Sequence, residues 1–167
     1  MERDRQHGFQ NVLVVEDNPD DTDLLRIAAK SAPGAVSFHI VENGESALLY
    51  LEGQGEYADR HSHPFPDLVL LDLSLPGMSG FEVLTRIRQH PQFGTLKVFV
   101  WTDSGDPTAL ERALKAGANR FVPKSISFVR GGLAGLVREM SKAILSCPEM
   151  HNASGQSAQP ASSEAAQ

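Results

Sequence analysis

The chain has 167 residues, of which 15 are Lys or Arg and 21 are Asp or Glu, so its formal net charge is −6. This length suffices for one domain with a sizeable core and is too short for two domains of ordinary size. The acidic balance argues against nucleic acid as a direct partner, because phosphate binding needs clustered Lys and Arg.

The sequence carries no recognisable targeting or membrane signal. Residues 1–10 are charged and lack the apolar run of a signal peptide. No stretch approaches the roughly 20 apolar residues that a membrane-spanning helix needs. The one cysteine, Cys147, cannot form an internal disulfide and has no predicted base nearby to activate it. We therefore expect a cytoplasmic protein with no membrane contact and an inert thiol.

A strand followed directly by a helix is predicted near the start of the chain. Residues 12–15 form an apolar run that is typical of a strand buried on both faces of a parallel sheet. Asn18 and Pro19 then fit the N-cap and the first position of a helix. Three acidic residues favour the positive end of that helix: Asp20, Asp21 and Asp23.

The same alternation continues along the chain. Further apolar runs predict strands at 35–41, 67–71, 96–101 and 119–122. Helices are predicted to begin at Asn43-Gly44, at the capping box of Ser79 and Glu82, at Asp106-Pro107 and at about Ile126. The last three of these are expected to end at His90-Pro91, at Gly117 and at about Leu145. Between the second helix and the third strand, residues 53–66 form a long polar loop.

Five strands that alternate with five helices predict an α/β fold with a doubly wound parallel sheet. We expect the domain at residues 11–147, after a short extension at 1–10. Residues 148–167 are rich in Ser, Ala and Gln and contain no aromatic residue, so we predict a disordered tail there.

Chemically useful side chains follow four of the five predicted strands. In doubly wound sheets ligands bind beyond the carboxyl ends of the strands, where the strand order reverses. With the order 2-1-3-4-5, Glu16 and Asp17 after the first strand would lie beside Asp72 after the third. Three clustered carboxylates repel one another, and Mg²⁺, which prefers oxygen ligands, removes that cost.

Two further residues at the same sheet edge suit an anionic ligand. Lys124 follows the fifth strand and offers an ammonium group, and Thr102 follows the fourth and offers a hydroxyl donor. Metal, carboxylate, lysine and hydroxyl are the groups that phosphoryl transfer uses, because its catalysis is mostly positioning and charge neutralisation.

Four segments that carry these residues resemble the receiver domains of bacterial two-component response regulators, which have a flavodoxin-like fold. They are Val14–Asp21, Leu70–Gly80, Val100–Thr102 and Phe121–Lys124, and the resemblance covers residues 11–145. Each motif alone is weak. All four in order, each at a strand end, are highly specific.

The resemblance implies a role for each site residue. Asp72 would accept a phosphoryl group from a phosphohistidine of a sensor histidine kinase, and Lys124 would neutralise that group. Asp17, Asp72 and the backbone carbonyl of Ser74 would bind Mg²⁺, with Glu16 acting through metal-bound water. Thr102 would move towards the phosphoryl group, and Phe121 would follow into the vacated space. The helix from Pro107 and the strand from Asn119 would then present a changed surface to a partner.

Two features depart from the commonest receiver pattern. The residue after Lys124 is Ser125 rather than a proline with a cis bond, and the sequence leaves open whether this bond is cis. In addition, the loop at 53–66 is longer than usual. In both features the chain resembles the small receivers that partner phytochrome-type histidine kinases.

Output would then pass to a downstream protein or phosphotransfer partner, or through a homodimer. Our hypothesis places that surface on the fourth and fifth helices, with Val129 and Leu133 near its edge. We expect the other candidates to be structural: His61 and His63 in a solvated loop, and Trp101 as a packing residue.

Three other functions are compatible with parts of the pattern. A haloacid-dehalogenase-type phosphatase also phosphorylates an Asp after a strand, but it usually has a second acid two residues later, where this chain has Ser74. A flavin- or nucleotide-binding module would need a phosphate cradle where Glu16 and Asp17 repel phosphate. An interaction scaffold that keeps the receiver fold without phosphorylation stays open.

Overall fold

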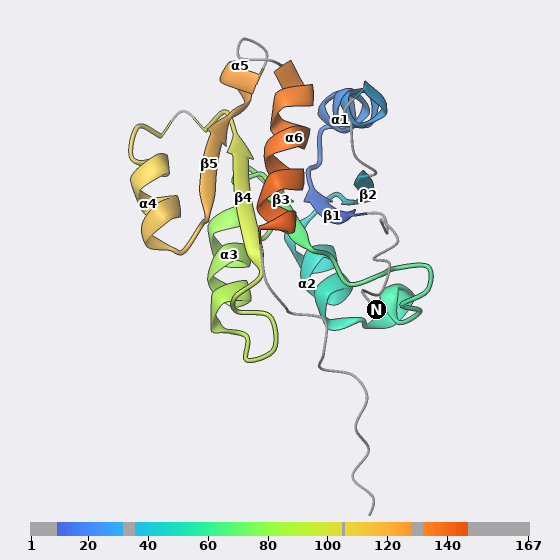
Figure 1. The fold of residues 1–167 in the computed structure, drawn as a ribbon. Helices are drawn as coiled ribbons and strands as arrows, with labels where there is room; N and C mark the ends of the chain where they lie inside the picture. Colours follow the sequence, from blue (N-terminus) through green and yellow to red (C-terminus); the bar gives the residue numbers. More distant parts are fainter. Residues whose placement is uncertain (1–9, 32–35, 105, 128–131, 147–167) are drawn as a thin grey trace, which may run out of the picture.

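The computed structural model describes residues 10–31, 36–104, 106–127 and 132–146. Within them, five parallel strands form one sheet in the order β2-β1-β3-β4-β5, which confirms the predicted fold class and strand order (Figure 1). The strands are β1 (Gln10–Val15), β2 (Val36–Val41), β3 (Leu68–Leu71), β4 (Lys97–Thr102) and β5 (Arg120–Pro123).

Helices connect the strands and cover both faces of the sheet. They are α1 (Pro19–Ser31), α2 (Gly44–Glu52), the 3₁₀ turn η1 (Gly55–Tyr57), α3 (Gly80–Gln89), α4 (Ala109–Lys115), α5 (Lys124–Ser127) and α6 (Gly132–Leu145). In the part of the chain that the structure describes, no helix has the length and apolar character needed to span a bilayer.

The core is divided by the sheet into two apolar layers. Side chains alternate between the faces along each strand, so Leu13 and Val15 of β1 pack with α2, α3 and α4. Val12 and Val14 point the other way and pack with α1 and α6. All four are fully buried, which explains why β1 is a continuous apolar run.

The helix starts were predicted correctly where side-chain caps mark them. The side chain of Asn18 accepts a hydrogen bond from the N–H of Asp20 ahead of α1, and Asn43 accepts one from Ser46 ahead of α2. Ser79 and Glu82 form the predicted capping box at α3. These caps satisfy N–H groups that have no partner within the helix.

Two predicted helix boundaries differ in the structure. The fourth helix begins at Ala109 rather than at Asp106, because the carboxylate of Asp106 accepts hydrogen bonds from the N–H and hydroxyl of Thr108 and forms a turn before the helix. The last helix, predicted from Ile126, is helical at 124–127 and again at 132–145, and residues 128–131 lie outside the described part.

The loop at 53–66 is more ordered than its polar sequence suggested. It contains η1, and the guanidinium of Arg60 donates to the carbonyls of Tyr50 and Leu51, each at 2.7 Å. These carbonyls belong to the last turn of α2, where helix carbonyls lack the usual donors of the next turn, and that of Tyr50 also accepts the N–H of the cap residue Gly53. His63 is half-buried and its ring packs edge-on against the rings of Tyr50 and Tyr57, so the prediction of a solvated residue is wrong for His63 and correct for His61.

Removing the Arg60 side chain tests its role in holding this loop. We expect Arg60→Ala to lower the free energy of unfolding by about 1–3 kcal/mol, because carbonyls of α2 lose charged donors. The exposed Arg86 on α3 is the matched control, and Arg86→Ala should change stability by less than about 0.5 kcal/mol. Urea denaturation measures both, and equal losses would contradict the assigned role.

Candidate functional site

The predicted acidic residues converge at the carboxyl ends of β1 and β3. These strands are neighbours, with Val15 paired to Leu71, so the residues that follow them share one edge of the sheet. Glu16, Asp17 and Asp72 each place a carboxylate oxygen so that all three lie within 4.8 Å of one another. Glu16 and Asp72 are buried, and Asp17 is exposed.

Hydrogen bonds hold the carboxylate of Asp72 from three sides. Its Oδ1 accepts from the hydroxyl of Thr102 at 2.7 Å and from the N–H of Ser74 at 3.0 Å, and its Oδ2 accepts from Nζ of Lys124 at 2.9 Å. Burial alone would raise the pKa of Asp72, but these three donors outweigh it and hold the pKa below its ordinary value. Asp72 is therefore ionised at neutral pH, and its carboxylate is held in one orientation.

The loop after Asp72 is fixed by the close approach of α3. The N–H of Gly80 donates to the carbonyl of Leu73 at 3.1 Å. A Cβ at residue 80 would lie 2.1 Å from the backbone oxygen of Asp72, so only glycine allows α3 to begin there.

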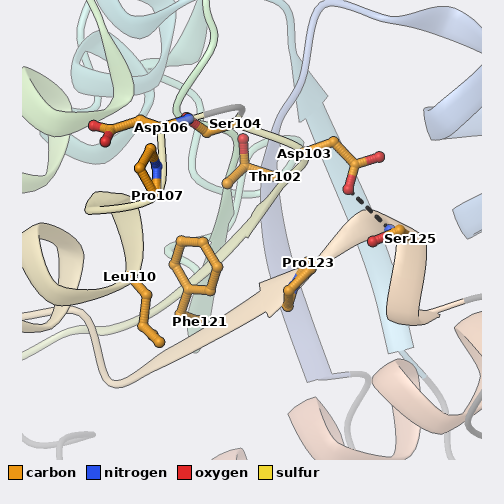
Figure 2. Close-up of a pocket in the computed structure, with 9 residues that line it drawn as sticks. All are labelled: Thr102, Asp103, Ser104, Asp106, Pro107, Leu110, Phe121, Pro123 and Ser125. Atoms are coloured by element: carbon orange, nitrogen blue, oxygen red, sulfur yellow. Dashed lines mark hydrogen bonds between the residues drawn. The ribbon is translucent and has the colours of Figure 1, made fainter.

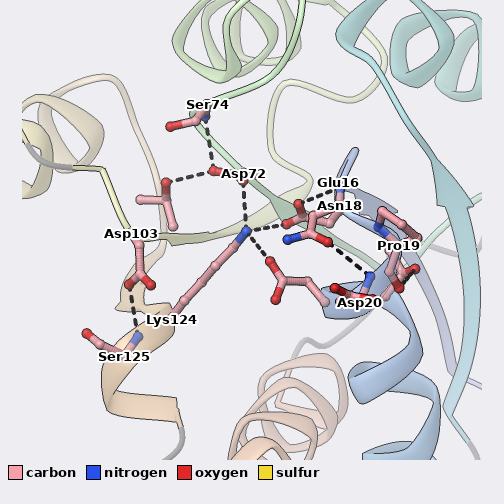
Figure 3. A network of polar contacts seen from close by, with 12 residues as sticks. Glu16, Asn18, Pro19, Asp20, Asp72, Ser74, Asp103, Lys124 and Ser125 are labelled. Atoms are coloured by element: carbon pink, nitrogen blue, oxygen red, sulfur yellow. Dashed lines mark hydrogen bonds and ion pairs between the residues drawn. The ribbon is translucent and has the colours of Figure 1, made fainter.

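Lys124 is the cation that balances this acidic edge (Figure 3). Its Nζ lies 2.7 Å from Glu16 Oε2, 2.8 Å from Asp21 Oδ2 and 2.9 Å from Asp72 Oδ2. Burial would lower the pKa of Lys124, but the three carboxylates outweigh it and raise the pKa above its ordinary value. The ammonium also lies 5.0 Å from the ring centroid of Trp101, which is buried as predicted.

Glu16 has a different electrostatic setting from Asp72. Burial raises the pKa of Glu16 to about 7, with the nearby Asp72 adding to the rise and Lys124 opposing it. A buried carboxylate of this kind is stabilised by a second cation beside it.

The donor set at this edge fits a hard divalent cation. Among the described residues, Glu16, Asp17 and Asp72 form the group of potential metal ligands whose atoms converge. All three offer carboxylate oxygens, the donors that Mg²⁺ takes. The geometry and chemistry thus match the predicted Mg²⁺ site, whereas His61 and His63 belong to no such group in the described part of the chain.

Thr102 contacts Asp72 and also lines a hollow of about 360 Å³ (Figure 2). Phe121 is half-buried beside this hollow rather than in the acidic cluster. The hollow is lined by Thr102, Asp103, Ser104, Asp106, Pro107, Leu110, Phe121, Pro123 and Ser125. Thr102 is thus the residue that contacts both Asp72 and the space next to Phe121.

The residue that departs from the usual receiver pattern makes a specific contact. Ser125 donates its backbone N–H to Oδ1 of Asp103 at 2.9 Å, a bond that a proline at this position lacks the hydrogen to form (Figure 2). No cis peptide bond occurs in the described residues, so the Lys124–Ser125 bond is trans. This contact joins the segment after β4 to the start of α5.

Two site residues were not identified from the sequence. Asp21 was assigned only to the acidic start of α1, although it binds Lys124, which is 103 positions away. Asp103 was not singled out. Its position directly after Thr102, at a strand end, was the available signal.

The predicted partner surface needs correction. Leu133 is only 8% exposed and packs in the core layer of α1 and α6, because it lies on the sheet-facing side of α6. Val129 lies outside the described residues. The correction concerns Leu133 alone, because the fourth helix of the prediction, α4, does expose apolar side chains, with Leu110 and Leu114 49% and 48% exposed, and α6 exposes Leu145.

These features define a receiver, and the family comparison agrees with them. Residues 12–131 match the family model of the response regulator receiver domain, which is more than half of the chain. The chain therefore belongs to the response regulator receiver family.

The chain is also similar to individual response regulators in sequence and in structure. The response regulator Rcp1 of Synechocystis sp. is 33% identical over 114 residues, which cover 68% of this chain and 76% of Rcp1. The phosphorylated cyanobacterial phytochrome response regulator RcpA has a TM-score of 0.71 and 29% identity, covering 83% of this chain and 96% of RcpA. The Mn²⁺-bound form of Rcp1 has a TM-score of 0.69 and 29% identity over 84% of this chain and 97% of that one.

Replacing Ser125 tests the contact with Asp103. We expect Ser125→Pro to lower the free energy of unfolding by about 1 kcal/mol, because Asp103 loses its donor. Ser125→Ala keeps the N–H and should stay within about 0.5 kcal/mol of wild type.

A double-mutant cycle separates this bond from the effect of the proline ring on the Lys124 backbone. In an Asp103→Ala background, Ser125→Pro should cost less than it does in wild type. Equal costs in the two backgrounds would show that the hydrogen bond does not stabilise the fold.

Proposed function

We propose that this protein is a response regulator that accepts a phosphoryl group on Asp72 from the phosphohistidine of a sensor histidine kinase, in a Mg²⁺-dependent reaction in the cytoplasm. The observation that carries the proposal is the arrangement around Asp72. An ionised carboxylate accepts hydrogen bonds from Thr102 and Lys124 beside two further acidic groups, Glu16 and Asp17.

The proposed transfer uses one oxygen of Asp72 as the nucleophile. That oxygen forms a bond to phosphorus while the bond from phosphorus to the imidazole nitrogen of the kinase breaks, and the imidazole leaves. Lys124 and Thr102 are positioned to contact the phosphoryl oxygens, because both already contact the oxygens of Asp72. Glu16, Asp17, Asp72 and the backbone carbonyl of Ser74 would hold the Mg²⁺, which supplies charge neutralisation.

The response in this proposal begins at Thr102. Its hydroxyl donates to Asp72 now and would donate to the phosphoryl group afterwards. Thr102 lines the hollow that also contacts Phe121 and Leu110, so its displacement changes the space available to Phe121. The exposed side chains of α4 would then form a changed surface for a downstream protein, a phosphotransfer partner or a second copy of the chain.

The relatives support a phytochrome-type kinase as the source of the phosphoryl group. RcpA is described as a phytochrome response regulator, and Rcp1 is similar in sequence and structure. The chain also resembles that group in two sequence features, Ser125 in place of a proline after Lys124 and the long loop at 53–66.

Mass spectrometry tests the phosphoacceptor directly. After incubation with Mg²⁺ and acetyl phosphate, wild type should gain one phosphoryl group and Asp72→Asn should gain none, because an amide oxygen is a poor nucleophile. Chelation of Mg²⁺ should abolish the gain. Asp20→Asn removes the same charge at an exposed position and should be phosphorylated like wild type.

The same experiment distinguishes the switch from a phosphorylation-independent scaffold. A protein that neither gains mass nor binds beryllofluoride over a range of concentrations would be such a scaffold. Phosphorylation of Asp72→Asn to the wild-type extent would place the acceptor elsewhere.

A further inference from the structure

Asp21 contacts the centre of the site without belonging to its metal-binding group. It lies in the first turns of α1, and its Oδ2 accepts a hydrogen bond from Nζ of Lys124 at 2.8 Å. The converging carboxylates of the candidate metal site are those of Glu16, Asp17 and Asp72. Asp21 therefore acts on Lys124 rather than on the cation.

The ammonium of Lys124 is surrounded by carboxylates. It carries three N–H groups, and three carboxylates lie within 2.9 Å of its nitrogen: those of Glu16, Asp21 and Asp72. They come from the end of β1, from α1 and from the end of β3. Two of these contacts, those to Asp21 and Asp72, are hydrogen bonds, so a phosphoryl oxygen that binds Lys124 competes with them.

Of the three carboxylates, Asp21 is the one that can be released most easily. A carboxylate that loses its cation must be solvated again, and a buried one cannot be. The Glu16 side chain is 1% exposed, whereas that of Asp21 is 17% exposed. Asp72 carries the phosphoryl group itself, so its own contact with Lys124 is replaced by contact with that group.

We propose that Asp21 is a positioning residue that holds the Lys124 ammonium towards α1 and competes for it with the phosphoryl group on Asp72. This inference rests on the proposed function. Asp21 thereby limits how strongly Lys124 stabilises the phosphorylated state. Because the competition acts through a hydrogen bond and a charge, it is weakened by an amide that keeps the shape of the side chain.

Beryllofluoride binding in Mg²⁺ measures the competition, with Trp101 fluorescence as the signal. Trp101 is the only tryptophan in the chain, and Lys124 lies 5.0 Å from its ring. We expect Asp21→Asn to bind beryllofluoride about three- to tenfold more tightly than wild type, because Lys124 is freed from a charged partner. Asp20→Asn, which removes an exposed charge one residue away, should bind like wild type.

A Lys124→Ala background separates competition for Lys124 from simple loss of a negative charge. If Asp21 acts through Lys124, Asp21→Asn has no effect on beryllofluoride affinity in that background. A gain that persists there, a gain shared by Asp20→Asn, or weaker binding by Asp21→Asn would each overturn the proposal.

A second measurement needs no phosphoryl analogue. It therefore tests the contact between Asp21 and Lys124 even if Asp72 proves not to be a phosphoacceptor. In wild type, the ¹H–¹⁵N signal of the Lys124 ammonium should be protected from exchange with water by its three carboxylate partners. Asp21→Asn should speed that exchange, and Asp20→Asn should not. Unchanged exchange would overturn the anchoring role of Asp21, whereas failure of wild type to bind beryllofluoride would overturn the phosphoacceptor function alone.

Discussion

One ammonium group contacts three of the carboxylates at the functional edge of this molecule. Lys124 lies within 2.9 Å of carboxylates from three different segments, and the nearest of them, Glu16, is almost completely buried. Without a cation, charges packed this closely in a poorly solvated site would repel one another strongly. The packing of β1, β3 and the β5–α5 junction around the site therefore depends on Lys124, and the acidic cluster in turn makes the edge attractive to a divalent cation.

The parallel sheet is what brings these groups together. Parallel strands all end on the same side, and the order β2-β1-β3-β4-β5 makes β1 and β3 neighbours although 52 residues lie between Val15 and Leu68. The three inner strands β1, β3 and β4 are buried on both faces, so their polar residues lie at their ends. The fold thus concentrates charged side chains at one edge, and two core layers hold the strands that carry them.

Local sequence signals predicted the strands, the caps and most of the site, because each depends on neighbouring residues. The apolar run before Glu16 and the capping box of Ser79 are examples. The pairing of Asp21 with Lys124 was missed because it depends on the distance between α1 and the end of β5. The hydrogen bonds from Arg60 to the carbonyls of α2 and the burial of His63 were missed for the same reason. The sequence of a polar loop does not indicate which of its side chains fold back onto the domain.

In the proposed switch, the contacts around Thr102 would link a change at Asp72 to the surface of the molecule. Thr102 donates to Asp72 on one side and lines the hollow beside Phe121 on the other. The next residue, Asp103, is bonded to the N–H of Ser125 and the residue before Ser125 is Lys124. The two side chains that contact Asp72, Thr102 at the end of β4 and Lys124 at the start of α5, are therefore joined to each other through adjacent residues. In the proposed switch, a shift of either one would therefore move the other, so the segment before α4 and the start of α5 would respond together.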